Sequence, residues 1–287
     1  MIRAILLVLL FCNSVVSFAP AIQSIPTSSS QLGLFNFGQT SAGGNAKIPT
    51  SSTDRDKQAI SSVKAAIEKP RNPSFPFVEC EFPALEALNK LGDGSLRSTL
   101  QAEEANIAFI SKLVKGLAPA PFMGPKVSVA VSSSASNSFL TNMKKKVSGA
   151  SVFSLKDGIP ELSVEDVCVV VTPSSRNDYQ AAKVLVESGS VKAVVVVNAF
   201  AKDQKSIPAM ATMAYFLKPL TYNSQVAGFL IRSYPGNWTV LDAFSKEVLG
   251  SFTDNEILVK KTNTPDLRSS GRLVQKSVDE RAIRARQ

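Results

Sequence analysis

The sequence of 287 residues contains no histidine and only three cysteines. Without histidine, the chain cannot build a Ser-His-Asp or Cys-His nucleophilic site, and it has no imidazole ligands for zinc. Cys12 lies in an N-terminal leader, which leaves Cys80 and Cys168 in the body of the chain. Two cysteines cannot hold a four-cysteine metal centre, and they make a weak case for an extracellular disulfide framework. Carboxylate–magnesium chemistry, phosphate binding and lysine chemistry remain open.

Long apolar segments are also rare. The run at residues 5–11 follows a basic residue and precedes small residues, a pattern typical of a secretory signal peptide. We predict a signal peptide at residues 1–17. A membrane anchor is the alternative, but the run is too short to cross a hydrocarbon core of about 30 Å as a helix. The longest later run, residues 191–201, is interrupted by polar residues and has the length of a strand, so we expect a soluble protein.

A second targeting signal follows the first. The sequence Ser-Phe-Ala-Pro at residues 17–20 resembles the cleavage motif of bipartite presequences in secondary plastids of the diatom type. Residues 18–46 contain no charged residue and are rich in Ser, Thr, Gly, Ala and Gln, as expected of a transit peptide. We predict a transit peptide or disordered linker at residues 18–52 and import into the chloroplast stroma, with contact to the thylakoid. Plain secretion is the alternative.

The remaining chain predicts one α/β domain at residues 53–259. Valine-rich runs alternate with amphipathic helices, which is typical of a Rossmann-like, mostly parallel sheet with flanking helices. Short strands separated by turn residues then predict an antiparallel extension, and Thr264-Pro265-Asp266 predicts the start of a terminal helix with proline at its first position. The predicted strands cover residues 77–82, 127–131, 167–171, 191–197, 227–234, 238–243 and 247–252.

Two glutamates occupy the first of these strands. Residues 77–82 alternate apolar and charged side chains, which predicts a half-buried strand with Glu79 and Glu81 on its outer face. Together with Asp93 in an Asp-Gly turn, these carboxylates are candidates for acid–base chemistry or cation binding. We favour a solvated face for them. We expect no resident metal or other cofactor, and we assign no catalytic residue.

Polar loops follow three of the valine-rich strands. In a doubly wound sheet such loops form the ligand site, and helix N-termini within them attract anions. Glycine-rich nucleotide fingerprints are absent, so the serines can equally be helix caps. The candidate ligand- or phosphate-binding residues are Ser134, Ser136, Asn137, Ser174, Ser175, Arg176, Asn198 and Lys202.

The C-terminal segment, residues 260–287, is a basic and partly helical tail. Eight basic residues stand against three acidic ones, which is typical of an electrostatic attachment to lipid head groups, nucleic acid or an acidic protein. The alternative is a solvated helix face. The tail has no aromatic residue on which bases could stack, which disfavours nucleic acid. The basic residues are Lys260, Lys261, Arg268, Arg272, Lys276, Arg281, Arg284 and Arg286.

The body of the chain resembles a plastid and cyanobacterial family known as a domain of unknown function. The resemblance rests on residues 77–83, residues 88–95 and the two strand–helix units that follow, and it covers residues 56–252. The family includes the low-photosystem-II-accumulation assembly factors of chloroplasts. The resemblance implies only that some members help to build photosystem II at the thylakoid. Because histidine and nucleotide fingerprints are absent, we expect a non-enzymatic factor that binds a plastid protein during photosystem or thylakoid assembly. The basic tail leads us to expect peripheral contact with an anionic thylakoid surface. An enzyme that binds a small molecule or nucleotide phosphate is the alternative.

Overall fold

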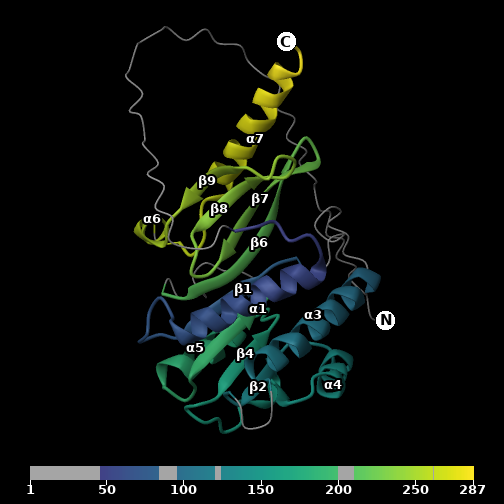
Figure 1. Ribbon diagram of the computed structural model, residues 1–287. Coiled ribbons are helices and arrows are strands. Elements are labelled where there is room, and N and C mark those ends of the chain that lie inside the picture. Colours follow the sequence, from purple (N-terminus) through teal and green to yellow (C-terminus); the bar gives the residue numbers. More distant parts are fainter. Residues whose placement is uncertain (1–45, 84–95, 120–123, 200–209, 261) are drawn as a thin grey trace, which may run out of the picture. The chain divides into compact units, whose positions relative to one another are not determined.

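The computed structural model describes residues 46–83, 96–119, 124–199, 210–260 and 262–287 (Figure 1). The signal peptide, most of the transit segment and the candidates Asp93, Lys202 and Lys261 lie outside the described residues. A sheet of nine strands has the order β3-β2-β4-β5-β1-β6-β7-β8-β9. The pairs from β3 to β6 are parallel and those from β6 to β9 are antiparallel. The predicted α/β class, with antiparallel strands and a terminal helix added, is confirmed.

The strands are short except for the long hairpin of β6 and β7. Their bounds are β1 Phe77–Glu81, β2 Val127–Val131, β3 Ala150–Ser154, β4 Val167–Val171, β5 Ala193–Val197, β6 Thr212–Tyr222, β7 Gln225–Ser233, β8 Trp238–Asp242 and β9 Val248–Phe252. The α-helices are α1 Ser52–Glu68, α3 Leu96–Leu117, α4 Asn137–Lys146, α5 Arg176–Glu187, α6 Asp254–Val259 and α7 Leu267–Arg284, and one 3-10 turn, η1, spans Leu155–Asp157.

The parallel half is covered by helices on both faces. Every residue of β2, β4 and β5 is buried. The continuous apolar runs of β4 and β5 are typical of strands that are covered on both faces. Apolar residues of α1, α3 and α4 pack in one cluster on one face, whereas those of α5 pack in a second cluster on the other. The loops that lead from the parallel strands into these helices lie at the carboxyl ends of the strands. In open α/β sheets this is where ligands bind.

The half-buried prediction for the first strand is wrong. Strand β1 lies between β5 and β6 and pairs with both, so that it is central to the sheet. Its first four residues are buried, and Glu79 keeps only 2% of its surface exposed. Glu81, at the end of the strand, is half-buried. Alternation of apolar and charged residues is typical of an edge or one-sided strand, and here it occurs where both faces are covered.

Strands β3 and β6 and helix α6 were not predicted. Strand β3 is a short edge strand, and α6 has only six residues. Strand β6 carries Lys218 and Pro219, and proline disfavours the assignment of a strand inside a sheet. The hairpin of β6 and β7 turns at Asn223 and Ser224, which both have positive φ (50° and 61°), as expected of a two-residue hairpin turn.

The terminal helix packs on the antiparallel half of the sheet. Helix α7 contacts β6, β7, β8 and β9 (Figure 1). Gly228 of β7 faces Val274 of α7, and a Cβ on this glycine would lie 2.8 Å from the carbonyl oxygen of Leu241. Helix α7 begins after Asp266, whose carboxylate accepts hydrogen bonds from the backbone of the first turn. Pro265 therefore precedes the cap and does not occupy the predicted first helical position. None of the described helices is long and apolar enough to span a bilayer.

Candidate functional site

The parallel sheet has a switch in connection direction between β2 and β4. These neighbouring strands lead into α4 and α5, which lie on opposite faces of the sheet. In open α/β sheets, ligands bind in the crevice that such a switch creates beyond the carboxyl ends of the strands. The segments after β2 and β4 carry six of the candidate residues, of which Asn137 and Arg176 are the first residues of α4 and α5. Three further residues here are not among the candidates, namely Ser132 and Ser133 in the loop after β2 and Asp178 in α5.

The carboxylate of Asp178 joins the two loops. Its oxygens accept hydrogen bonds from the hydroxyl of Ser132 (2.8 Å) and the backbone N–H of Ser133 (3.1 Å), both in the loop after β2. They also accept from the backbone N–H groups of Ser174 (3.0 Å) and Ser175 (3.3 Å), in the loop after β4. Asp178 is buried. Burial alone would raise its pKa, but the hydrogen bonds from Ser133, Ser174 and Ser132 outweigh burial and lower it.

An internal carboxylate therefore holds the position that a bound anion would take. Three backbone N–H groups converge on Asp178, as they would on a phosphate oxygen. Around it the hydroxyls of Ser132 and Ser174 lie 2.9 Å apart, and Ser134 also bonds Ser174. A phosphate bound to these N–H groups would have to displace Asp178. Binding at this position would therefore cost the hydrogen bonds by which Asp178 joins the loops after β2 and β4.

The other serines in these loops are helix caps. Ser136 accepts from the N–H of Phe139 (3.0 Å) at the start of α4, and Ser175 forms a reciprocal capping box with Asp178 at the start of α5. Asn137 and Arg176 are exposed first residues of these helices. The structure thus brings Ser134, Ser174 and Ser175 together and uses Ser136 locally.

Asn198 connects β5, β1 and α3. Its side-chain oxygen accepts from the N–H of Phe82 (3.0 Å), and its side-chain nitrogen donates to Asn106 of α3 (2.7 Å). Its own N–H donates to the carbonyl of Cys80 (2.9 Å). With a positive φ of 49°, Asn198 occupies a conformation that asparagine tolerates better than most residues. These bonds fix the ends of two strands, so the side chain has a structural task at this edge.

The two described acidic candidates, Glu79 and Glu81, lie on the α5 side of β1. Glu79 and Glu81 raise the pKa of Tyr179, whose burial is the larger cause of the shift. The two free thiols are also buried, and burial raises the pKa of Cys168 to about 12, so this thiol is protonated at neutral pH. Among the residues that the structure describes, no group of three or more Cys, Asp or Glu side chains is placed to hold a metal ion.

One ionic cluster at this edge was not predicted. Asp56 of α1 is buried and accepts from Arg55 (2.6 Å) and from Lys112 of α3 (2.6 Å). Arg55 also donates to the carbonyl of Pro83 (3.1 Å), and its guanidinium lies 4.5 Å from the centre of the Phe82 ring. The burial of Asp56 could have been predicted from the sequence, because Asp56 precedes Ala59 and Val63 at helical spacing and so belongs to the buried face of α1. The cluster ties α1 and α3 to the end of β1.

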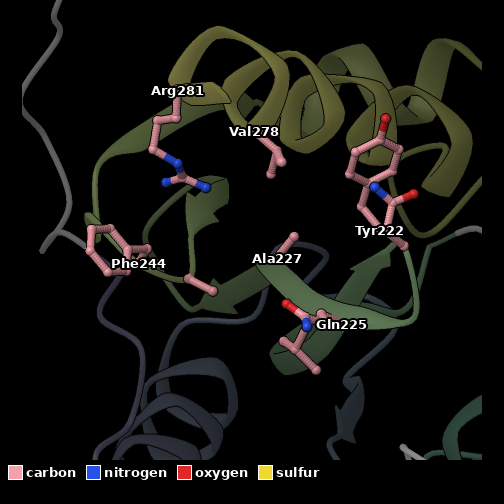
Figure 2. Close-up of a pocket in the computed structure, with 9 residues that line it drawn as sticks. Tyr222, Gln225, Ala227, Phe244, Val278 and Arg281 are labelled. Atoms are coloured by element: carbon pink, nitrogen blue, oxygen red, sulfur yellow. The ribbon is translucent and has the colours of Figure 1, made fainter. Parts of the chain in front are cut away.

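A groove lies in the antiparallel half, far along the chain from these loops. It has a volume of about 530 Å³ and is formed by the β6–β7 hairpin, the turn after β8 and the last turns of α7 (Figure 2). Its lining includes Tyr222, Gln225, Ala227, Phe244, Val278 and Arg281. The sequence placed Arg281 in the basic tail. No local sequence pattern could predict the groove, because it forms only where α7 packs on the sheet.

The basic residues of the C-terminal segment have two different surroundings. Arg281 pairs with buried Asp242 of β8 at 2.6 Å. Lys276 pairs with Glu280 at 3.8 Å, but both side chains are exposed and such pairs contribute little. The remaining described cations are exposed, and they are Lys260, Arg268, Arg272, Arg284 and Arg286.

These elements define a mixed α/β protein in which Asp178 joins the loops at the switch between β2 and β4 and a groove lies beside the last helix. Residues 49–255 match the family described as Domain of unknown function (DUF1995). Because the match spans well over half of the chain, the protein belongs to this family. It ends before α7, so Val278 and Arg281 of the groove lie beyond the matched residues. No curated protein and no solved structure matches the chain.

Proposed function

We propose that this protein is a partner-binding factor, not an enzyme, that acts in photosystem or thylakoid assembly in a plastid and reaches an anionic surface through α7. The observation that carries the proposal is the division of α7 into a docked face and a cationic face. A helix that is fixed on one side is already ordered, so it loses little conformational entropy when its charged side binds a partner.

The docked face is anchored by apolar packing and by one ion pair. Ser270 and Val274 are buried, and Arg281 pairs with Asp242. The opposite face carries Arg268, Arg272 and Lys276, which are spaced four residues apart and therefore lie in one row. All three are exposed. A row of cations on a rigid helix attracts lipid head groups or an acidic protein face, with a strength that falls as salt screens it.

The plastid setting rests on two resemblances. The leader resembles a bipartite plastid presequence, and the body resembles a family with members in photosystem II assembly. The filled crevice supports binding over catalysis, because Asp178 already uses the N–H groups that would otherwise receive a phosphate.

Charge reversal on α7 tests the attachment. The triple variant Arg268→Glu, Arg272→Glu, Lys276→Glu should lose co-sedimentation with isolated thylakoid membranes at about 0.1 M salt. The matched control reverses Lys144, Lys145 and Lys146, three exposed lysines at the end of α4, and changes the net charge by the same amount. Binding should survive in the control. If both variants lose membrane binding equally, the effect comes from net charge and not from α7. If both variants keep membrane binding, the proposed role of α7 is refuted.

A reporter tests the address. Residues 1–51 fused to a fluorescent protein should deliver it to the plastid stroma, and Phe18→Ala should hold it outside the inner envelope. Normal arrival of the Phe18→Ala reporter in the stroma would contradict the bipartite leader.

A further inference from the structure

The groove beside α7 combines an apolar floor with aromatic ends. Ala227 of β7 and Val278 of α7 direct their side chains into it, with Tyr222 at one end and Phe244 near the other (Figure 2). Phe244 is 83% exposed, which is unusual for so large an apolar side chain. The hydroxyl of Tyr222 donates to Asp279 of α7 (3.1 Å), and this bond fixes that ring at the mouth of the groove.

The cation Arg281 lies beside the exposed ring of Phe244 and is fixed by an ion pair with Asp242. The guanidinium of Arg281 lies 5.5 Å from the centre of the Phe244 ring. It donates to the carboxylate of Asp242, which is fully buried and also accepts from Ser277 Oγ (2.8 Å) and from the backbone N–H of Phe244 (2.7 Å) and Ser245 (2.9 Å). The Arg281 side chain nevertheless keeps 31% of its surface exposed. A guanidinium has five N–H donors, so it can bind a second carboxylate while it stays paired with the first.

We infer that this groove binds an acidic peptide segment that places a bulky apolar side chain on the Ala227–Val278 floor and a carboxylate on Arg281. The inference rests on the proposed function, because a protein partner supplies the segment. Charge complementarity favours an acidic occupant, since the charged side chain among the residues that line the groove is that of Arg281. The carboxamides of Asn223 and Gln225 line the same groove and offer both donors and acceptors to a peptide backbone.

This mode of binding differs from attachment through the outer face of α7. Contact with the floor is apolar and insensitive to salt, whereas the row of Arg268, Arg272 and Lys276 acts only through charge. The two surfaces can therefore be disabled one at a time, and the groove can be tested without a membrane.

Fluorescence polarisation with the full chain tests the groove. The probe is a labelled nonapeptide of glutamate and glycine residues with one central tryptophan, compared with the same peptide carrying serine in place of tryptophan. We expect wild type to bind the tryptophan peptide at least about tenfold more tightly than the serine peptide. Phe244→Ser should remove most of this preference. Its matched control is Val259→Ser, because Val259 is equally exposed (84%) but lies outside the groove, and it should bind like wild type.

A second variant keeps the test independent of Phe244. Ala227→Trp fills the groove from its floor and should abolish peptide binding, with circular dichroism to show that the fold persists. Absence of tryptophan-dependent binding by wild type, or wild-type affinity in Phe244→Ser, would overturn the inference. So would dimerisation in analytical ultracentrifugation, or binding to anionic vesicles, if either is lost in Phe244→Ser. The triple variant Arg268→Glu, Arg272→Glu, Lys276→Glu should still bind the peptide. This result would show that the groove works even if the proposed membrane attachment through α7 fails.

Discussion

Arg281 Nη1 lies 2.6 Å from Asp242 Oδ1, and this ion pair joins the last helix to β8. The carboxylate is fully buried, whereas the guanidinium keeps part of its surface in solvent. A buried carboxylate without its partner is strongly destabilising, so the pair makes the position of α7 specific. Residues beyond the matched family domain are thus part of the folded body of this protein.

Acid should weaken this connection. Burial alone would raise the pKa of Asp242, but hydrogen bonds from Arg281, Ser245 and Ser277 lower it to about 2. Because the folded state favours the ionised carboxylate, the stabilisation is complete above the unfolded pKa of about 3.9 and is lost as pH falls through about 2. Urea unfolding of wild type should show a loss on the order of 2 kcal/mol over this range. Asp242→Asn should be less stable at neutral pH and should show a flatter dependence; a slope equal to that of wild type would contradict the assignment.

Two glycines of the α7 region should respond in opposite directions to the same change. Gly228→Ala places a methyl group against Val274 and the carbonyl of Leu241, and overpacking of this kind costs about 1–3 kcal/mol. Gly271→Ala in α7 meets nothing within 4 Å, so it should stabilise the protein by about 0.5–1 kcal/mol through helix propensity. Chemical denaturation of both variants checks the packing of α7. Equal small effects would show that α7 does not rest on β7.

The valine-rich strands could be predicted because their local sequence determines their environment. Strands β2 and β4 have the predicted bounds, and β5 differs by two residues at its start. Strand order is not a local property, and this explains the error at β1, where Glu79 is buried because the strand became central. The same holds for the candidate site. Serine loops could be identified from the sequence, but the part played by Asp178 depends on β2 and β4 being neighbours.

A pair of identical substitutions tests the assignment of β4. Val169 is fully buried in the middle of this strand, whereas Val164, a few residues earlier, is 63% exposed. Val169→Asp should lower the free energy of unfolding by about 3–5 kcal/mol, because an unpaired charge would be buried. Val164→Asp should stay within about 0.5 kcal/mol of wild type, as surface changes usually do. Thermal and urea unfolding measure both, and the reverse order would refute the strand.

Removal of the internal carboxylate should open the crevice to an external anion. Asp178→Ala leaves the N–H groups of Ser133, Ser174 and Ser175 without their acceptor, and we expect a loss of about 2–4 kcal/mol. Sulfate should then stabilise the variant more than wild type, because an anion that binds only the folded state raises its stability by mass action. Sodium chloride at the same ionic strength controls for screening.

Asp266→Ala supplies the matched variant for this experiment. Asp266 also accepts from two backbone N–H groups, those of Arg268 and Ser269, but it is an exposed helix cap that joins no second loop. Its loss should cost about 1 kcal/mol, and sulfate should affect it as it affects wild type. A sulfate effect confined to Asp178→Ala would mean that the chain's own carboxylate keeps phosphate out of the crevice. An equal sulfate response in wild type would mean that the crevice already accepts anions, and it would restore the phosphate-binding alternative.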